Sequence, residues 1–319
     1  MSALRRSLVA TAVAGAATAG YGGLIERNQF TLRRFAVPVL DPGSPALRVL
    51  HISDLHLTAA QRRKQDWVSQ LATLRPDYVI NTGDTSSDPD GIPAVLNALG
   101  PLFDFPGAFV PGNNDYYVPQ PKNPARYFLP NKVGNLQGRR RMPWDQLAAA
   151  MELRGWLDLT HVRTTVRVAG LPVALAGTDD PHLRRARYDR IAGPADPAAV
   201  VRIGVTHSPE PWILGAFAGD GYDLVLAGHT HGGQIRVPFL PEWTLGRLKV
   251  PWPEYRAGWL DDFGAAGNRL YVNRGVGFSS GPLRVGCLPE LTFLTLRCTE
   301  PRAEAAGVER VGLSQRPAS

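Results

Sequence analysis

The sequence predicts an α/β fold whose functional site lies at the carboxyl ends of the strands. Two observations support this class: short apolar runs alternate with helical segments, and five of the runs end in a cluster of Asp, Asn or His. In open α/β sheets, ligands bind where the strands end. The length of 319 residues is enough for one large domain of this kind, or at most two.

The first half of the chain supplies three of these strands, each followed by polar residues. Apolar runs predict strands over 47–52, 78–80 and 108–110, which end at 53–56, 82–84 and 111–115. Helices are predicted over 59–74 and 92–99, and Pro76 follows the first of them. Residues 117–143 are rich in Pro, Asn and basic residues, and we expect an excursion near the rim of the site.

The second half repeats this pattern of strands ending in polar residues. Residues 166–176 alternate like a hairpin and end at 177–180, while strands over 202–205 and 223–227 end at 206–207 and 228–231. The last predicted strands cover 270–273, 283–287 and 291–298. The polar tail over 299–319 is expected to be disordered.

The N-terminal residues predict a membrane anchor or an export signal. Arg5 and Arg6 precede an uncharged, Ala- and Gly-rich run over 7–25, and the Arg pair loosely resembles a twin-arginine signal. Charged residues from Glu26 onward mark the return to water, and 41–45 form a turn-rich linker. We therefore assign 1–46 to the anchor or signal with its linker, and 47–298 to the folded domain. The chain is expected to be membrane-associated or exported, on either side of the membrane.

The net charge of +7 carries little information about partners. Residues 1–46 hold five arginines against two acids, and the chain contains no long basic block and no basic stripe interleaved with aromatic residues. This composition disfavours a dedicated nucleic-acid binder. The two cysteines, Cys287 and Cys298, lie far in sequence from the clustered histidines and do not suggest a CxxC zinc site.

Seven residues at the predicted strand ends carry side chains that bind metal ions: Asp54, His56, Asp84, Asn113, His207, His229 and His231. Residues spaced i and i+2 on an extended segment point the same way, so Asp54 and His56 can face one centre, as can His229 and His231. Mixed carboxylate, imidazole and amide ligands suit Mn, Fe or Zn. Because seven ligands are too many for one ion, the set predicts two divalent ions that share a bridging carboxylate.

These motifs, in this order, resemble those of the calcineurin-like metallophosphoesterase family. The matching elements are Asp54-x-His56, Gly83-Asp84, Gly112-Asn113-x-Asp115, Thr206-His207 and Gly228-His229-Thr-His231-Gly-Gly-Gln234, and the match covers residues 47–298. The last motif, together with the apolar N-terminus, is similar to the membrane-associated subgroup. That subgroup contains YaeI- and YkuE-like phosphoesterases and UDP-2,3-diacylglucosamine pyrophosphatases of the LpxG type.

The resemblance implies a four-layer αββα sandwich, in which two mixed β-sheets pack face to face and helices flank them. It implies that Asp54, His56 and His231 hold the first ion, and that Asn113, His207 and His229 hold the second. Asp84 would bridge the two ions. It also implies hydrolysis of a phosphoester, in which a metal-bound hydroxide attacks phosphorus.

One residue departs from the family pattern. The Gly-Asn-His-Asp motif of the family reads Gly-Asn-Asn-Asp over 112–115, so Asn114 replaces the histidine credited with protonating the leaving group. Asn114 can donate a hydrogen bond but cannot deliver a proton. We therefore expect a preference for leaving groups of low pKa, such as a nucleoside phosphate or a phenolate, unless His182 supplies the proton.

The expected substrate is a phosphodiester or pyrophosphate of a lipid-linked or envelope molecule. Arg139, Arg140 and Arg141 are candidates for binding its phosphate or a lipid headgroup, although such runs are often only solvated. Trp243, Trp252 and Trp259, in a loop predicted over 236–259, form either ordinary packing or an apolar lip at the membrane interface.

Two other functions compete with this one. A cyclic-nucleotide or general phosphodiesterase is the second enzymatic reading, and a nuclease gains little support from the weak basicity of the domain. Outside enzymes, the alternative is a metal-binding scaffold that has lost catalysis, with Asn114 as the supporting observation.

Overall fold

The computed structural model describes residues 3–119, 136, 138–237, 240–244, 253–264, 267–278 and 281–298. Among these residues the strands form two six-stranded sheets and one two-stranded ribbon. The first sheet has the order β1-β14-β2-β3-β4-β5, over Thr31–Leu40, Glu290–Cys298, Leu47–Ile52, Tyr78–Asn81, Gly107–Phe109 and Trp156–Asp158. The second has the order β12-β13-β9-β8-β7-β6, over Gly258–Asp261, Arg269–Val272, Leu224–Ala227, Val201–Val205, Leu171–Gly177 and Val162–Val168. The ribbon pairs β10 (Arg236–Val237) with β11 (Leu240–Thr244).

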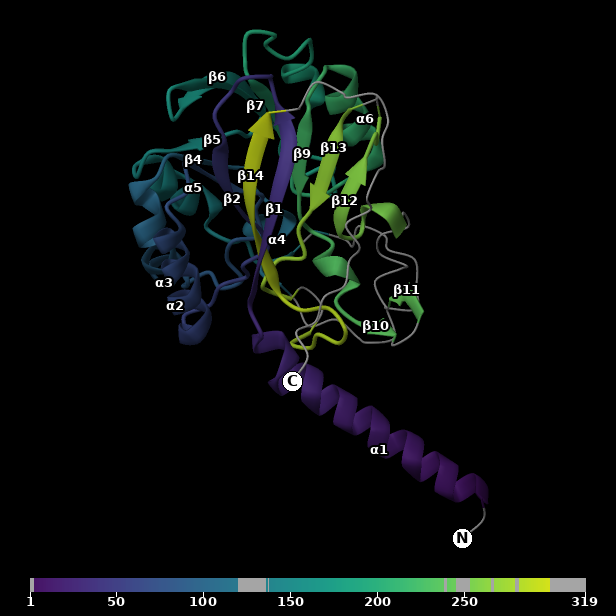
Figure 1. Ribbon diagram of the computed structural model, residues 1–319. Coiled ribbons are helices and arrows are strands. Elements are labelled where there is room, and N and C mark those ends of the chain that lie inside the picture. The colour runs from purple at the N-terminus through teal and green to yellow at the C-terminus, as the bar shows by residue number, and fades with distance from the viewer. Residues whose placement is uncertain are drawn as a thin grey trace.

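Both sheets mix parallel and antiparallel strands. In the first sheet β2, β3, β4 and β5 run parallel, and β14 lies antiparallel to β2. In the second, β7, β8, β9 and β13 run parallel, and the edge strands β6 and β12 run against them. The head of the β14 arrow points away from α1 (Ala3–Leu24) in Figure 1, so the strands antiparallel to it end on the α1 side of the molecule.

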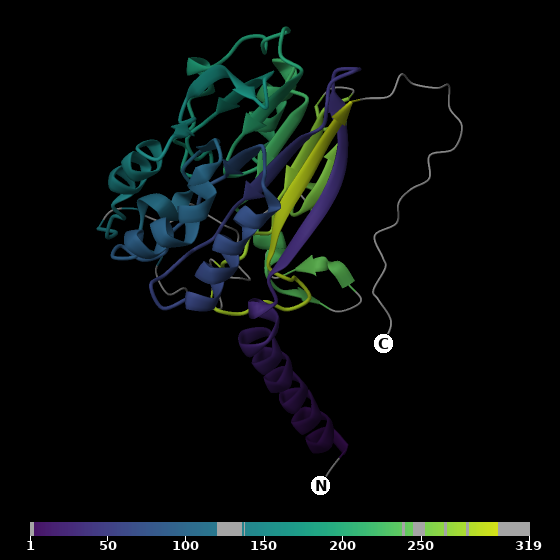
Figure 2. The same cartoon turned by 60° about the vertical axis from the view of Figure 1, so that its left-hand side comes forward.

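Helices cover the outer faces of both sheets. The first sheet is covered by α2 (Arg62–Gln70), α3 (Ile92–Leu99) and α5 (Trp144–Glu152), and the second by α6 (Pro211–Gly219), as Figures 1 and 2 show. Short 3-10 turns extend α2 and α3, at η2 (Leu71–Leu74) and η3 (Gly100–Asp104). The expected four-layer αββα sandwich of two mixed sheets is therefore confirmed.

The apolar runs of the sequence are explained by burial on both faces of each sheet. In β2, Val49 faces the second sheet in the core between the sheets, and Leu50 faces the outer core beneath α2 and α3. In β9, Leu226 lies in the core between the sheets and Val225 in the core beneath α6. Strands buried on both faces lose the alternation of polar and apolar residues, which is why they appear as continuous apolar runs.

Three segments differ from the sequence prediction. The predicted loop over 236–259 contains the ribbon strands β10 and β11 and the start of β12. Residues 31–40, which the sequence analysis places with the anchor and linker, form β1, which pairs with β14. The charge of Arg33 disguised this strand, because its guanidinium bonds to the buried carboxylate of Glu290 at 2.5 Å. Residues 283–287 are not a strand: they form a loop with a single bridge between Val285 and Ile235, and Gly286, with a φ of 63°, turns the chain.

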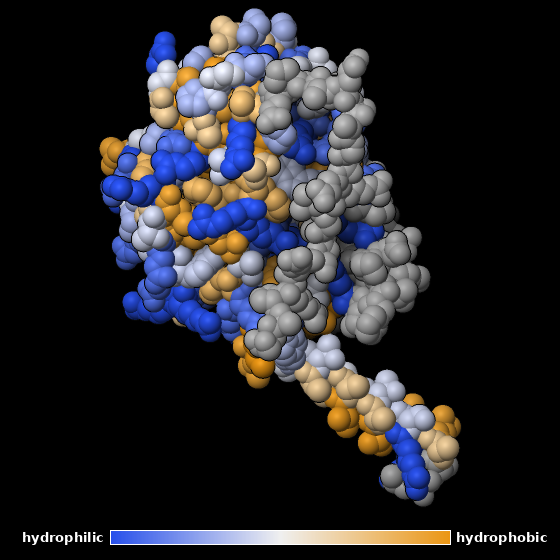
Figure 3. Space-filling view, in the orientation of Figure 1, coloured by the Kyte–Doolittle hydropathy of each residue, from blue (hydrophilic) through white to orange (hydrophobic). Residues whose placement is uncertain are grey.

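The N-terminal helix α1 projects from the body, as Figures 1, 2 and 3 show. By length and composition, the segment Ala3–Asn28 is the one stretch among the described residues that could cross a membrane. A short turn, η1 (Glu26–Asn28), joins α1 to β1. Glu26, expected to mark the return to water, is instead buried, at 4% exposure. The tail over 299–319 and much of the excursion over 117–143 lie outside the described residues.

Candidate metal centre

The loops that follow β2, β3, β4, β8 and β9 converge at one end of the sandwich, and each carries polar side chains. Three of these loops come from the first sheet and two from the second, so the site lies across the seam between the sheets. Together they carry all seven side chains that the sequence analysis proposes as metal ligands: Asp54, His56, Asp84, Asn113, His207, His229 and His231. The structure brings all seven into one cluster.

Four buried side chains form the first half of the cluster. His56 Nε2 lies 3.3 Å from His231 Nε2 and 3.3 Å from Asp84 Oδ2. His231 Nε2 also lies 3.4 Å from Asp54 Oδ1. One ligand atom from each of these four residues lies within 4.8 Å of the others, so a single metal ion could contact all four.

The second half of the cluster continues from Asp84 toward solvent. His207 Nε2 lies 3.5 Å from Asp84 Oδ2 and 3.2 Å from His229 Nδ1. His229 Nδ1 in turn lies 2.9 Å from Asn113 Oδ1. Asn113 and His229 are only half-buried, so this half is the open side of the site. Asp84 Oδ2 is in reach of both halves, which is the position of a bridging ligand.

The backbone that presents these side chains is left-handed at most of the candidate ligands. Positive φ angles between 44° and 70° occur at Asp54, His56, Asp84, His229 and His231. Residues other than glycine seldom adopt this conformation, and such strain gathers at functional sites. The sequence argument assumed extended segments, on which residues i and i+2 point the same way. That reason was wrong, because each pair faces the centre from a left-handed turn.

The cluster has the properties of a cation site. Asp54 Oδ1 is buried and accepts no hydrogen bond from the residues that the structure describes, so one of its electron pairs points unsatisfied into the cluster. His207 Nδ1 donates a 2.7 Å hydrogen bond to the Thr82 carbonyl, so Nε2 is the ring nitrogen that can bind a metal ion in place of a proton. Nitrogen and oxygen donors of this kind fit a divalent first-row metal.

The electrostatics of the cluster also favour a positive charge. Burial would raise the pKa of the Asp84 carboxyl, but His207 and His56 outweigh it and hold this pKa well below its ordinary value. Burial would lower the pKa of His207, but the Asp84 carboxylate raises it well above its ordinary value. Burial and the neighbouring His56 hold the pKa of His231 far below its ordinary value, which keeps that ring in the neutral, metal-binding form.

Asp115 and two glycines hold the loops in place. The Asp115 carboxylate accepts hydrogen bonds from the backbone N–H groups of Asp84 and Gly112, at 2.7 and 2.9 Å, and so ties the loops after β3 and β4 together. A Cβ at Gly112 would lie 2.7 Å from the His207 ring and would overlap the Asp84 carboxylate. A Cβ at Gly228 would overlap Ser53 and Asp54. Only glycine allows the loops to approach this closely.

Asn114 donates two hydrogen bonds to the Asp84 carboxylate. Its backbone N–H donates to Asp84 Oδ1 at 2.7 Å, and its side-chain amide donates to Oδ2 at 2.6 Å. The residue that replaces the expected histidine therefore holds the Asp84 carboxylate in place, and its side-chain amide donates one hydrogen bond to that carboxylate.

His182, the second candidate for proton transfer, lies beside the open half of the site. Its ring centroid is 4.5 Å from that of His229. Its Nδ1 lies 3.8 Å from the Glu210 carboxylate, and both side chains are 20% exposed. The sequence offered no sign of Glu210, because it belongs to no motif and approaches His182 only through the fold.

The predicted substrate-binding arginines lie next to the site loop but not in the cluster. The chain over 139–141 pairs with the segment that follows α4 (Asn113–Tyr116): Val118 N–H donates to the Arg140 carbonyl at 3.0 Å, and Tyr117 bridges to Arg141. Within the described part of the chain, no hydrogen bond joins the Arg139, Arg140 or Arg141 side chains to the metal ligands.

The expected tryptophan lip is only partly within the described structure. Trp259 packs against Phe35 of the first sheet and Tyr271 of the second, with ring centroids 5.5 and 4.8 Å from its own, so it contributes to ordinary packing. Trp252 and the side chain of Trp243 lie outside the described residues.

Two buried cations support the site and were missed from the sequence. The Arg284 guanidinium is fully buried, donates to the Gly275 and Gly277 carbonyls at 3.0 and 2.6 Å, and reaches His231 Nδ1 at 3.4 Å. Lys64 Nζ donates to the Leu55 carbonyl at 2.9 Å, between the two ligands of that loop. Neither cation stands in a recognisable motif, so no sequence signal could have found them.

Comparisons with known proteins agree with this geometry. Residues 47–233 match the family described as calcineurin-like phosphoesterase. YpbG of Bacillus subtilis (strain 168) is 28% identical over 293 residues, which cover 90% of this chain and 95% of that protein. The Escherichia coli (strain K12) phosphodiesterase YaeI is 28% identical over 311 residues, which cover 93% of this chain and 100% of that protein. A Danio rerio transmembrane protein with a metallophosphoesterase domain is 26% identical, over 79% of this chain and 53% of that protein.

Proposed function

The chain belongs to the calcineurin-like phosphoesterase family and is a metallophosphoesterase, and we propose that it hydrolyses a phosphodiester or pyrophosphate bond at a centre of two divalent ions, Mn, Fe or Zn. Asp54, His56 and His231 would hold the first ion. Asn113, His207 and His229 would hold the second, with Asp84 between them. When bound, such ions supply an activated water near neutral pH and neutralise charge on the phosphate.

The position of Asp84 is the observation that carries this proposal. Its Oδ2 atom lies 3.3 Å from His56 Nε2 and 3.5 Å from His207 Nε2, so one carboxylate oxygen faces both halves of the cluster. A single-ion site has no use for a ligand in this position, whereas a pair of ions shares one. The half-buried second half then leaves room for a phosphate to enter beside Asn113 and His229.

The proton for the leaving group is the remaining requirement of the reaction. Asn114 cannot supply it, because its amide N–H groups are not acidic and one of them donates a hydrogen bond to Asp84. His182 lies against the open half of the site, with the Glu210 carboxylate 3.8 Å from its Nδ1, so it is the described residue best placed to give a proton there. A leaving group of low pKa would depart without that help.

The proposal is tested with aryl and alkyl phosphodiesters of matched size. Because general acid catalysis is worth about 10² to 10⁴ in rate, we expect the wild type to cleave the aryl ester at least about 100-fold faster than the alkyl ester. Asn114→His should narrow the ratio of the two rates by accelerating hydrolysis of the alkyl ester. His182→Ala should widen it, whereas Glu210→Gln should have a smaller effect in the same direction. Equal wild-type rates on the two esters would contradict the preference for low-pKa leaving groups.

A lipid-linked substrate, such as a UDP-diacylglucosamine, is the finer part of the proposal. Three features support it: the apolar α1, the relative named as a transmembrane protein, and the arginines over 139–141 that follow the site loop and could contact a phosphate or headgroup. Membrane association through α1 belongs to the same proposal. A metal-dependent screen of UDP-linked lipids against cyclic nucleotides tests it, and faster turnover of the cyclic nucleotides would favour a general phosphodiesterase instead.

A further inference from the structure

The dimensions of α1 suit a lipid bilayer. Its 22 residues correspond to about 33 Å of helix, close to the roughly 30 Å of a bilayer's hydrocarbon core. Gly22 is the one buried residue of this helix, so almost its whole surface is exposed. Leu8 and Val13 are each 63% exposed, and Tyr21 stands near the base of the helix, where an aromatic ring suits the membrane interface.

The junction between α1 and the body is stiff. Ile25 N–H donates to the Tyr21 carbonyl at 2.8 Å, and Asn28 N–H donates to the Ile25 carbonyl at 3.0 Å, so the helical turns continue into η1. The Asn28 side chain also donates to the Leu24 carbonyl at 2.9 Å. A junction bonded in this way transmits the direction of α1 to the body.

The base of α1 is fastened to the loop over 281–287. The buried Glu26 carboxylate accepts hydrogen bonds from the N–H groups of Gly286 and Cys287, at 3.0 and 2.6 Å. Arg27 donates to the Pro282 carbonyl at 3.2 Å. Gly22 packs so closely on this loop that an added Cβ would lie 2.7 Å from a Val285 methyl group. We call these contacts the anchor clamp.

The clamped loop is the one that supports the metal centre. Arg284 carries its buried guanidinium to the Gly277 carbonyl and to His231. Cys287 Sγ lies 3.2 Å from the His231 carbonyl, and Gly277 N–H donates to the Asp54 carbonyl at 2.7 Å. One short loop therefore separates α1 from the ligands of the first ion.

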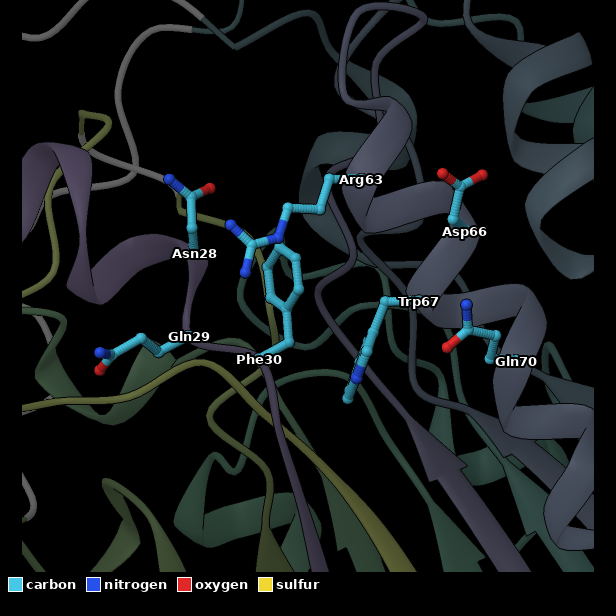
Figure 4. Close-up of a pocket in the computed structure, with 7 residues that line it drawn as sticks. All are labelled: Asn28, Gln29, Phe30, Arg63, Asp66, Trp67 and Gln70. Carbon is cyan, nitrogen blue, oxygen red and sulfur yellow. The ribbon is translucent and has the colours of Figure 1, made fainter.

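The surface around the base of α1 also suits a bilayer surface. A groove of about 500 Å³ lies between residues 28–30 and α2, and Figure 4 shows residues that line it: Arg63 and Asp66, with Phe30 and Trp67, whose rings are tilted at 36° with centroids 5.4 Å apart. Aromatic rings mixed with charged and amide groups are typical of the layer that contacts lipid headgroups. Figures 1 and 2 place this end of the body, and not the opposite one, next to α1.

We propose that α1 is retained as an anchor and that the anchor clamp holds the metal centre facing the bilayer, so that the substrate is an amphiphile whose phosphate lies at the bilayer surface. The proposal rests on the phosphoesterase function proposed above and adds the orientation of the site to it. Lipids of the same bilayer would bring the phosphate to the open half of the cluster. The clamp would not change the rate of hydrolysis of a soluble phosphodiester.

The orientation is tested with two labels placed at the opposite ends of β2. Ala60, in the loop after β2, and Ala46, just before it, are both exposed alanines, so Ala60→Cys and Ala46→Cys form a matched pair. Each is made in a Cys298→Ser background, since Cys287 is buried and unreactive.

The full chain, labelled with a fluorophore, is reconstituted in phosphatidylethanolamine and phosphatidylglycerol vesicles that carry a nitroxide on the headgroup. We expect several-fold stronger quenching at position 60 than at position 46. Equal quenching, or the reverse order, would overturn the proposal, as would recovery of a membrane-derived chain that lacks α1.

The role of the clamp is tested by inserting about ten Gly and Ser residues between Leu24 and Ile25. This flexible linker separates α1 from the clamp residues Glu26 and Arg27 and lets the body turn freely. The insertion should abolish the difference in quenching between the two labels. It should also lower turnover of an acylated aryl phosphodiester embedded in the vesicles several-fold, while soluble bis-p-nitrophenyl phosphate is hydrolysed as before. Unchanged quenching and turnover would show that the clamp does not set the orientation. If the protein without the linker insertion does not hydrolyse the soluble ester, the proposed phosphoesterase function is contradicted instead. The two failures can therefore be distinguished.

Discussion

Asp84 is the residue on which the two halves of the site depend. Its carboxylate is 1% exposed, faces His56 and His207, and is held by Asn114. Asp84→Asn removes the shared negative charge but keeps the side-chain shape. We expect loss of one bound ion and a fall in turnover of more than about 100-fold, since even residues that only support metal ligands are worth 10- to 100-fold. Metal content and hydrolysis of an aryl phosphodiester measure the two effects.

Asp90→Asn is the matched control for this prediction. Asp90 is exposed on the same loop, away from the cluster, and should keep both metal content and turnover. An Asp84→Asn variant that retained two ions and wild-type turnover would contradict the bridging role.

His51 illustrates a histidine that serves the core and not the site. It is fully buried in β2, bonds to Thr82 Oγ1 at 3.1 Å, and burial lowers its pKa to about 3. The unfolded chain binds this proton below about pH 6.5, whereas the folded chain does not, so this residue's contribution to stability falls as the pH drops below 6.5. Between pH 7.5 and 5 the loss amounts to about 2 kcal/mol.

His51→Gln should remove that part of the acid sensitivity, because glutamine does not titrate. Urea unfolding of the metal-free wild type and variant, at pH 7.5 and at pH 5, measures it. The wild type should lose about 2 kcal/mol more than the variant over this range. The same loss in both proteins would show that His51 does not stay neutral in the fold.

At the residue scale, the sequence identifies the candidate metal ligands better than the residues that hold those ligands in position. The candidate ligands could be predicted because their types and spacings match a familiar chemistry, and the fold brings them together. Arg284 and Glu210 could not, because an isolated arginine or glutamate in a sequence is far more often solvated. Only the fold shows that Arg284 is buried against His231.

The loops that follow the strands are the elements that make the site possible, and their glycines allow it. Gly112→Ala would push a methyl group against the Asp84 backbone nitrogen, 2.6 Å away, and the His207 ring. We expect metal affinity to fall about tenfold or more, as when the support of a metal ligand is lost. Isothermal titration with Mn²⁺ measures the change.

Gly100→Ala provides the control for Gly112→Ala. Gly100, like Gly112, has a negative φ that alanine can adopt, but an added Cβ there meets no atom within 4 Å. Gly100→Ala should leave the metal affinity unchanged. Equal effects of the two substitutions would mean that the close approach at Gly112 does not matter.

At the element scale, strands buried on both faces were predictable and elements with mixed surroundings were not. The apolar runs of β2, β3, β8 and β9 follow from their position in the middle of the sandwich. β1 escaped prediction because it lies at an edge, where its arginines meet Glu290 or solvent. The loop over 283–287 resembles a strand because Leu283, Val285 and Cys287 alternate with other residues, yet they pack against α1 and the site loops.

At the scale of the whole molecule, each of the two sheets supplies part of the site. The first sheet presents Asp54, His56, Asp84 and Asn113, and the second presents His207, His229 and His231, so neither sheet alone carries a complete cluster. The tight core between the sheets fixes the two sets of ligands against each other. The layered architecture followed from the family resemblance, whereas the relation of α1 to the metal centre required the three-dimensional structure.

The central claim is that this cluster binds two divalent ions and uses both. The most direct measurement is a titration of metal-free protein with Mn²⁺, in which bound ions per chain and hydrolysis of bis-p-nitrophenyl phosphate are followed together. The account predicts that two ions bind and that activity appears only as the second site fills. Binding of a single ion with full activity, or a fully loaded protein that remains inert, would contradict it, and the second result would favour a metal-binding scaffold without catalysis.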